Sequence, residues 1–273
     1  MGKKVWIVNY YCPPPEYNSN TRHLGFTHYL QASGYDVTLF TSGFLNRGEG
    51  IDLVPADKEY AEVLYGEYKY VHSKTNRYKG NGLARMKSIY TFAHRLKRLR
   101  KHFDKPDVVI QNMHAPFDYQ VCKMAKQLHA RYIAEAWDLW PYDFVTFGLI
   151  SGKNPIMKWA YGIERKMYES ASDIVFSFEG GLDYLRWHKW TTEGGGRINP
   201  NKVHYINNGL DVAAFDKNVA EHPNADPDLH DQTKFRIVYM GSIRLANNLI
   251  QLIDAASILK TDPKFSFLIY GNG

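Results

Sequence analysis

Short apolar runs alternate with helical patterns along most of this chain of 273 residues. Strands are expected at residues 4–10, 36–41, 107–112, 131–136, 173–178 and 202–207. Helices are expected near residues 22–32, 117–128, 154–170 and 180–187. Such alternation is typical of strand, helix, strand units in a parallel sheet. Because the strands are continuously apolar, we expect an α/β fold whose sheet is covered by helices on both faces.

The pattern also predicts how the chain divides into domains. Residues 42–66 and 188–201 are polar and aperiodic, so we interpret them as loops. The stretch "DKNVAEHPNADPDLHDQT" (216–233) contains two prolines and many acids, which is typical of an interdomain linker. Runs at 234–242, 247–260 and 265–271 then form a fresh strand, helix, strand unit. We therefore expect a first domain at 1–215, a linker at 216–233 and the start of a second domain at 234–273.

Composition narrows the classes of protein that the chain can belong to. No apolar run approaches the roughly 20 residues that a membrane-spanning helix needs, so a cytoplasmic protein is expected. Cys12 and Cys122 lack metal-ligand spacing and are expected to be reduced thiols. The formal net charge of +6 permits binding to nucleic acid or anionic lipid. No helix-turn-helix, RRM or zinc-finger pattern accompanies that charge, so we expect no nucleic acid partner.

Positive charge is concentrated in "LARMKSIYTFAHRLKRLRKHF" (83–103), which contains no acidic residue. Its apolar residues recur at helical spacing and predict an amphipathic helix. Two interpretations stay open: a solvated helix face packed on the sheet, or a surface that contacts anionic lipid. Its basic residues are Arg85, Lys87, Arg95, Lys97, Arg98, Arg100 and Lys101.

The loop between the first expected strand and helix is the first candidate site. Asn18, Ser19 and Asn20 are small and able to cap a helix, and Arg22 adds a positive charge. In a doubly wound sheet such a loop lies at the carboxyl ends of the strands, beside a helix N-terminus that can bind anions. The alternative is an ordinary N-cap with a surface arginine.

A second candidate follows the strand expected at 131–136. Asp138 stands between Trp137 and Trp140, whose faces could stack on a sugar ring. An aspartate in this position could equally cap a helix or form a turn. His114, at the end of the preceding strand, is a candidate general base, although a lone histidine is more often structural.

A third candidate opens the second expected domain. Gly241 would let the backbone approach a ligand, and Arg244 at the expected helix start could bind a phosphate. The chain contains no G-x-G-x-x-G, Walker, H-E-x-x-H or G-x-S-x-G motif.

Taken in order, these stretches resemble a family-4 glycosyltransferase of the GT-B fold, of the type that builds bacterial surface polysaccharides. "VNYYCPPPEYNSNTRH" (8–23) resembles that family's first strand and loop, with Asn18, Ser19 and Asn20 in place of a Gly-Gly pair. "WDLWP" (137–141) is similar to the family's "RDLWP", with Trp137 in place of arginine. Three further stretches resemble the family in the same order: "YGIERKMYESASDIVFSFEGGLDYL" (161–185), "INNGLDVAAF" (206–215) and "VYMGSIRLANNLIQLIDAA" (238–256).

The resemblance implies a GT-B fold made of two Rossmann-like domains, with sugar transfer in the cleft. A nucleotide sugar would be the donor, a saccharide or polyprenyl-linked saccharide the acceptor, and the inner membrane a possible docking surface. Transfer would proceed with retention at the anomeric carbon, with no cofactor and no metal. Asp138 falls at or beside the family's catalytic position, and His114 is the neighbouring candidate. Donor contacts would come from Asn18, Ser19, Asn20, Gly241 and Arg244, and acceptor contacts from Thr21, Arg22, His23, Trp137 and Trp140.

The chain ends on "KFSFLIYGNG" (264–273), where members of that family continue into a further helix. We therefore expect that residues 1–273 by themselves bind donor poorly and transfer no sugar. A non-catalytic module that binds a glycan or a lipid-linked saccharide is the alternative function.

Overall fold

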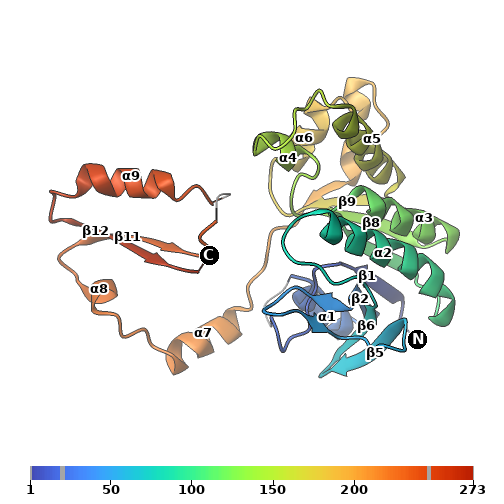
Figure 1. Ribbon diagram of the computed structural model, residues 1–273, viewed down its shortest axis with the longest axis horizontal. Helices are drawn as coiled ribbons and strands as arrows, with labels where there is room; N and C mark the ends of the chain where they lie inside the picture. Colours follow the sequence, from blue (N-terminus) through green and yellow to red (C-terminus); the bar gives the residue numbers. More distant parts are fainter. Residues whose placement is uncertain (1, 19–21, 245–246, 273) are drawn as a thin grey trace. The chain divides into compact units, whose positions relative to one another are not determined.

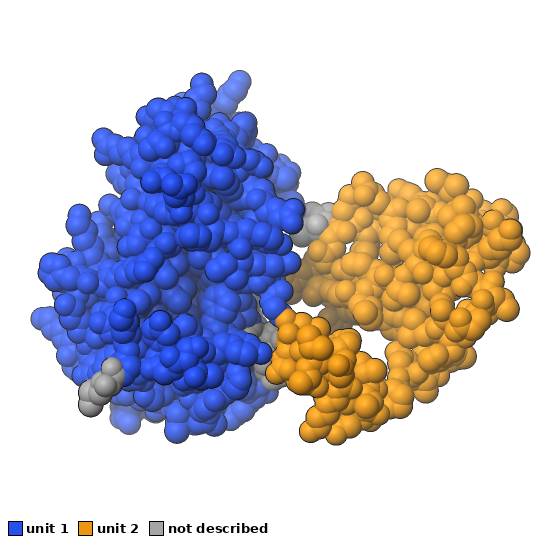
Figure 2. Space-filling view, turned by 180° about the vertical axis from the view of Figure 1, so that it is seen from behind, with its two compact units in different colours: residues 1–209 blue, residues 210–273 orange. Residues whose placement is uncertain are grey.

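The computed structural model describes residues 2–18, 22–244 and 247–272. The chain forms two compact units, residues 1–209 and residues 210–273, which Figure 2 colours blue and orange. Each unit is described by itself.

Unit 1 is built on an eight-stranded sheet with the order β10-β9-β8-β7-β1-β2-β6-β5. Neighbouring strands are parallel except for β5 and β6, which are antiparallel. The predicted α/β fold with a largely parallel sheet is confirmed (Figure 1). The strands are β1 (Lys4–Val8), β2 (Asp36–Ser42), β5 (Tyr60–Tyr65), β6 (Tyr68–Ser73), β7 (Val108–Asn112), β8 (Arg131–Ala136), β9 (Asp173–Phe176) and β10 (Val203–Tyr205).

Helices cover both faces of this sheet, because side chains alternate between the faces along each strand. On one face Val5 and Ile7 of β1 cluster with Leu24 of α1 (Arg22–Ala32). On the other face Trp6 and Val8 cluster with Phe92 of α2 (Leu83–Leu99). The other helices of unit 1 are α3 (Tyr119–Gln127), α4 (Tyr142–Thr146), α5 (Pro155–Ser170) and α6 (Gly181–Trp187).

The prediction of a loop over residues 42–66 was wrong. This stretch contains β3 (Phe44–Leu45), β4 (Ile51–Asp52) and β5, and β6 follows at once. Polar residues alternate with apolar ones in β5 and β6, so neither strand shows a continuous apolar run. The turn between them contains Gly66 at a φ of +59°. β6 lies between β2 and β5, so the missed hairpin supplies one whole edge of the sheet.

The basic helix predicted at 83–103 is confirmed as α2, followed by a 3-10 turn at Arg100–His102. Four of its basic side chains bond within the protein. Arg85 donates to Tyr11 Oη at 2.6 Å and Arg95 to the Lys74 carbonyl at 2.7 Å, while Arg98 pairs with Glu59 and Arg100 bonds the Lys97 carbonyl. Contact of α2 with a membrane stays a prediction. Within the described ranges, no helix is both long and apolar enough to span a bilayer.

Unit 2 contains the predicted strand, helix, strand element: β11 (Phe235–Met240), α9 (Ile250–Leu259) and β12 (Phe265–Tyr270), with the two strands parallel. Residues 216–233, expected to be an irregular linker, contain the end of α7 (Val212–Glu221) and all of α8 (Pro227–His230). Two of the residues that suggested a linker in fact start a helix: Asp226 caps α8, and Pro227 takes its first helical position. α7 begins before this stretch, where Asp211 caps it. The domain boundaries at 215 and 233 stay predictions.

A buried carboxyl group lies under α6 in unit 1. The side chain of Glu164 on α5 is fully buried, and Tyr184 Oη donates to its Oε2 at 2.9 Å. Its Oε1 has no hydrogen-bond partner among the residues that the structure describes. Burial raises the pKa of Glu164 well above its usual range, so the folded protein holds this group as a neutral acid.

Glu164→Gln is therefore expected to stabilise unit 1 by an amount that grows with pH. Above pH about 4.3 Glu164 loses its proton in the unfolded chain but keeps it in the folded protein. The free energy of unfolding of the wild type therefore falls by about 1.4 kcal/mol per pH unit, up to the folded pKa of Glu164. Glutamine has no such cost. Urea unfolding at pH 5, 6.5 and 8 can be followed by tryptophan fluorescence, since all six tryptophans lie in unit 1. A difference from wild type that stays constant with pH, as expected for the exposed control Glu49→Gln, would contradict the prediction.

Candidate functional site

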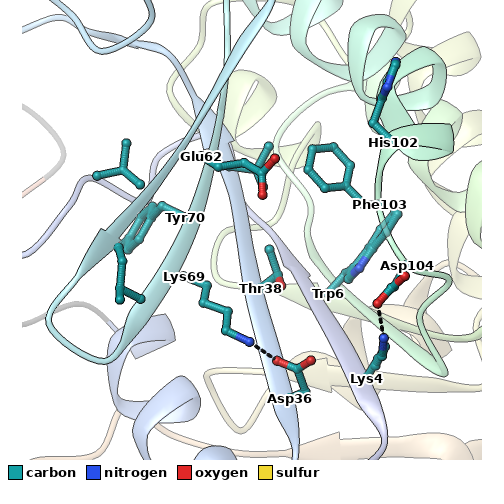
Figure 3. A pocket seen from close by; sticks show the side chains of 13 residues that line it. Lys4, Trp6, Asp36, Thr38, Glu62, Lys69, Tyr70, His102, Phe103 and Asp104 are labelled. Atoms are coloured by element: carbon teal, nitrogen blue, oxygen red, sulfur yellow. Dashed lines mark hydrogen bonds and ion pairs between the residues drawn. The ribbon is translucent and has the colours of Figure 1, made fainter.

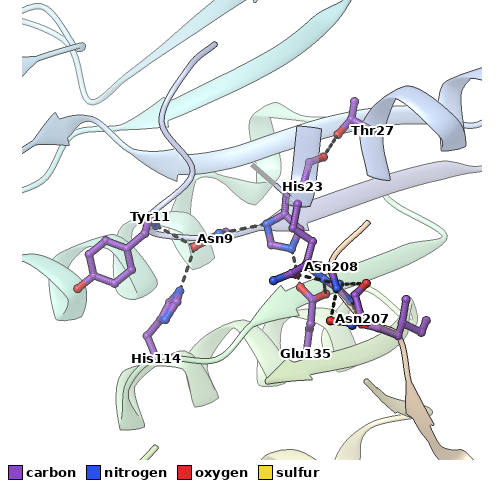
Figure 4. Close-up of polar contacts among 10 residues, drawn as sticks. Asn9, Tyr11, His23, Thr27, His114, Glu135, Asn207 and Asn208 are labelled. Atoms are coloured by element: carbon purple, nitrogen blue, oxygen red, sulfur yellow. Dashed lines mark hydrogen bonds and ion pairs between the residues drawn. The ribbon is translucent and has the colours of Figure 1, made fainter. Parts of the chain in front are cut away.

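Polar side chains gather where β1, β7 and β8 end, next to the start of α1. Asn9 follows β1, His114 lies two residues after β7, and Glu135 is near the end of β8. Figure 4 shows Asn9 between His114 and His23, with Glu135 on the far side of His23. The carboxyl ends of parallel strands are the usual ligand-binding edge of such a sheet.

Arg22, His23 and Glu135 form a buried ionic cluster. Arg22 Nε donates to Glu135 Oε1 at 2.7 Å, and His23 Nε2 lies 2.5 Å from Oε2. The side chain of Arg22 is 4% exposed and the other two are fully buried. Burial would raise the pKa of Glu135, but His23 and Arg22 outweigh burial and hold it below its usual range. The cluster therefore keeps a carboxylate ionised inside the protein.

Arg22 also binds the segment that follows β10. Its guanidinium donates to the Ile206 carbonyl at 2.6 Å, to the Asn207 carbonyl at 2.7 Å and to Asn208 Oδ1 at 3.2 Å. One side chain thus joins the start of α1, the end of β8 and the last residues of unit 1. The contact of Arg22 with the acceptor stays a prediction. The Arg22 guanidinium is already bonded to four oxygen atoms of the protein.

Asn9 links the two histidines of the site. Its Oδ1 accepts from the Tyr11 amide at 2.8 Å and lies 3.0 Å from His114 Nε2. Its Nδ2 lies 3.1 Å from His23 Nδ1. Because the Tyr11 amide is always a donor, it fixes which end of the Asn9 amide faces each histidine. His114 therefore donates from Nε2, which leaves Nδ1 as its basic nitrogen.

Glu135 and Asn9 act on His23 in opposite directions. Burial lowers the pKa of His23, but the Glu135 carboxylate outweighs burial and raises it to about 9. The amide group of Asn9, in contrast, needs His23 Nδ1 to accept a hydrogen bond, and an imidazolium has a proton there. The neutral tautomer, protonated at Nε2, satisfies the hydrogen bonds of both partners, whereas the lowered pKa of Glu135 depends on the cation.

His114 is held in place by its own loop and by α2. The Asp118 carboxylate accepts from the amides of His114 and Ala115 at 2.6 and 2.9 Å. The His114 ring meets Tyr11 edge-on at 4.8 Å, and Arg85 donates to the Tyr11 hydroxyl. Burial, together with the Arg85 charge, lowers the pKa of His114 to about 3. His114 is thus a neutral, oriented imidazole across the physiological pH range.

The other residues predicted after β8 lie in different surroundings. Trp137 packs on His23 with ring centroids 4.9 Å apart, and its Nε1 is buried without a partner among the described residues. Asp138 is exposed to solvent, and Trp140 is half-buried. The structure thus brings Trp137 into the cluster of Arg22 and His23 and leaves the Asp138 carboxylate accessible to solvent.

The predicted donor residues are divided between the units. Asn18 is exposed in unit 1, whereas Ser19, Asn20 and Thr21 lie outside the described residues. Gly241 and Arg244 follow β11 in unit 2, and both are exposed. α9 begins at Ile250, and residues 245–246, which directly follow Arg244, lie outside the described residues, so the place of Arg244 at a helix start stays a prediction.

Three residues of the site were missed from the sequence. Glu135 and Asn9 were interpreted as ordinary strand residues, although a charged residue inside the apolar run "RYIAEA" was a usable signal. Asn112, at the end of β7, is 2% exposed, and neither polar atom of its amide has a partner among the described residues. It pairs in register with Glu135 and belongs to the same edge of the sheet.

A cavity of about 540 Å³ lies elsewhere, near the beginnings of β1 and β2 (Figure 3). Its wall includes Trp6 and Phe103, together with two ion pairs, Lys4 with Asp104 and Lys69 with Asp36. Because it contains none of the predicted site residues, we assign the candidate site to the carboxyl edge. In the part of the chain that the structure describes, no three His, Cys, Asp or Glu side chains are grouped to hold a metal.

The sequence matches no protein-family model and no curated protein. Solved structures do share its fold. The α,α-trehalose-phosphate synthase (UDP-forming) from Burkholderia vietnamiensis has a TM-score of 0.64 at 11% identity, over 100% of this chain and 65% of that one. A structure described as trehalose-6-phosphate from E. coli bound with UDP-2-fluoro glucose has a TM-score of 0.65 at 12% identity, over 99% and 65%.

The catalytic domain of starch synthase IV from Arabidopsis thaliana, bound to ADP and acarbose, has a TM-score of 0.57 at 14% identity, over 99% of this chain and 69% of that one. This chain spans about 65% of the length of the two trehalose-phosphate structures. At identities this low the likeness concerns architecture alone. It establishes that the fold of this chain is of the GT-B type.

Proposed function

We propose that the chain is part of a glycosyltransferase that moves a sugar from a nucleotide sugar to a saccharide or lipid-linked saccharide. The observation that carries this proposal is the GT-B-type fold, shared with structures bound to UDP-2-fluoro glucose and to ADP with acarbose. The polar cluster at the carboxyl edge of the sheet supports it, since this edge is where such sheets bind ligands. The finer assignment is a family-4 enzyme of surface-polysaccharide synthesis that acts with retention and without a metal.

In this proposal unit 1 binds the acceptor. Trp140 and Trp137 offer ring faces to a sugar, and the exposed Asp138 carboxylate and the neutral His114 are the candidates for catalysis. The candidates for donor contacts are the turn at Gly241 and the exposed Arg244 in unit 2 and, in unit 1, the exposed Asn18. A cationic side chain at the leaving diphosphate would replace the charge that a metal supplies in other transferases.

Calorimetric titration with nucleotide sugars tests the proposal. The product of the whole gene is expected to bind one nucleotide sugar more tightly than the free sugar and to transfer it. Residues 1–273 by themselves are expected to bind donor weakly and to transfer nothing. Arg244→Ala should weaken binding of the nucleotide sugar and leave binding of the free sugar unchanged.

Two outcomes would contradict this function. If the whole gene product responds to no nucleotide sugar but binds a saccharide, the chain belongs to a non-catalytic glycan-binding module. Turnover by residues 1–273 in isolation would overturn the assignment of these residues to an acceptor domain with part of a donor domain.

A further inference from the structure

Four large apolar side chains face solvent on one short hairpin of unit 1. Phe147 and Leu149 follow α4 and are 49% and 66% exposed, while Ile156 and Trp159 in the first turns of α5 are 64% and 54% exposed. We call these four residues the α4–α5 surface. Single exposed apolar residues are common, but a group of them on one element marks an interaction site.

The hairpin holds these side chains outward on an ordered backbone. The amides of Leu149 and Ile150 both donate to the Phe144 carbonyl, at 2.9 and 3.3 Å, and Gly148 adopts a φ of +68°. This is the left-handed turn that commonly ends a helix. Asn154 then caps α5 by accepting from the Ile156 amide at 2.9 Å. The exposure of the α4–α5 surface is therefore built into the turn and the cap.

The opposite side of α5 already fills the core. Met157, Ala160 and Met167 are buried, so α5 packs on the core without using Ile156 and Trp159. Trp187 of α6, 64% exposed, extends the apolar region, because it packs edge-on against Tyr142 of α4 at 5.3 Å. The end of unit 1 that holds α4, α5 and α6 in Figure 1 thus carries apolar side chains from all three helices.

Between Asp143 on α4 and the buried Glu164 on α5, every charged residue is basic. From residue 144 to residue 163 the chain has two charged residues, Lys153 and Lys158, both exposed, and no acid. Tryptophan and long aliphatic side chains beside lysines form the combination that lies in the headgroup region of a bilayer. Lysine can bury its stem beside the lipid and keep its ammonium group at the phosphates.

We propose that the α4–α5 surface docks unit 1 onto an anionic lipid bilayer. The lysines favour an anionic surface over a second copy of this chain, whose formal net charge is +6. This surface differs from α2, where four of the basic side chains already bond within the protein. The proposal stands independently of sugar transfer. If transfer also occurs, α4 begins two residues after Trp140, so docking would hold the candidate acceptor site beside the membrane.

Flotation of the 273-residue chain with vesicles tests the proposal. One set of vesicles contains equal parts of phosphatidylcholine and phosphatidylglycerol, and the other contains phosphatidylcholine alone. Wild type is expected to float with the anionic vesicles, and the double variant Phe147→Ser, Leu149→Ser should lose that binding. Lys153→Glu with Lys158→Glu should weaken it by at least about 25-fold, since each lysine near an anionic surface is worth about a factor of five. The matched apolar control is Leu64→Ser on β5, which is 66% exposed and should float like wild type.

The same experiment also tests two alternatives, binding of lipid by α2 and binding of a second copy of the chain. Lys87→Glu on α2, combined with Lys101→Glu in the 3-10 turn after it, is the matched charge control and is expected to leave binding unchanged. Loss of binding in this variant, or wild-type flotation of the Phe147 and Leu149 variant, would overturn the proposal. A wild type that floats with neither set of vesicles but forms dimers that the α4–α5 variants lose would assign the surface to a second copy instead. Nucleotide-sugar titration of the whole gene product, rather than of residues 1–273, separates these outcomes from a failure of the proposed transferase function.

Discussion

Glu135→Gln is expected to lower the free energy of unfolding of unit 1 by about 3–5 kcal/mol. The substitution keeps the shape of the side chain but removes the charge that faces Arg22 and His23, and the Arg22 side chain is only 4% exposed. A buried cation without its counter-charge pays the desolvation cost with no Coulombic return. Urea unfolding followed by tryptophan fluorescence measures this loss in unit 1.

The matched control is a second histidine–glutamate pair on the surface. His28 Nδ1 lies 2.8 Å from Glu67 Oε1, and both side chains are about half exposed. Glu67→Gln should therefore cost less than about 1 kcal/mol. Equal losses in the two variants would mean that the Glu135 cluster adds no more than a surface pair.

Acid should remove the difference between wild type and Glu135→Gln. The folded pKa of Glu135 is held below its usual value, so its stabilising contribution is complete above the unfolded pKa of about 4.3. That contribution is lost as the pH falls through the folded pKa, because both states then bind the proton. A difference that persists unchanged at pH 2 would contradict the ionic origin of the effect.

The sequence predicted those parts of the fold that local pattern controls. The strands β7 and β8 each contain a run of three apolar residues, and their predicted bounds differ from the observed ones by at most one residue. β5 and β6 were missed because polar residues interrupt their apolar ones, and β5 lies at the edge of the sheet. α7 was missed for another reason: Val212, Phe215 and Val219 recur at helical spacing, but the stretch from Asp216 onward was interpreted as a linker.

The contacts of the site were harder to predict than the strand ends on which it lies. The structure brings His114, Trp137 and the start of α1 together at these ends, and the roles predicted for them stay predictions. The sequence did not predict that Arg22 contacts Glu135. Glu135 is more than a hundred residues away in the sequence, and the parallel register of β8 brings it to Arg22. Pairing of this kind depends on the order of the strands in the sheet, which periodicity does not encode.

Asp138→Asn is expected to abolish transfer by the whole gene product, with a loss of kcat/KM of about 10²–10⁴. Because Asp138 is exposed, unfolding of unit 1 and binding of the nucleotide sugar should be unchanged. Asp183→Asn, at another exposed carboxylate on α6, is the control and should retain full activity. Turnover that survives in Asp138→Asn would remove this residue from catalysis.

A second substitution, His114→Gln, distinguishes Asp138 from His114 as the base. The pKa of His114 is about 3, so an enzyme that depends on it should keep a flat kcat/KM from pH 5 upward. A base with so low a pKa is weak, and His114→Gln should then lower kcat less than Asp138→Asn does. If His114→Gln instead lowers kcat more, transfer depends on His114 rather than on Asp138. The Asn9 side chain, which contacts both His114 and His23, then joins the catalytic residue to the buried Glu135 cluster.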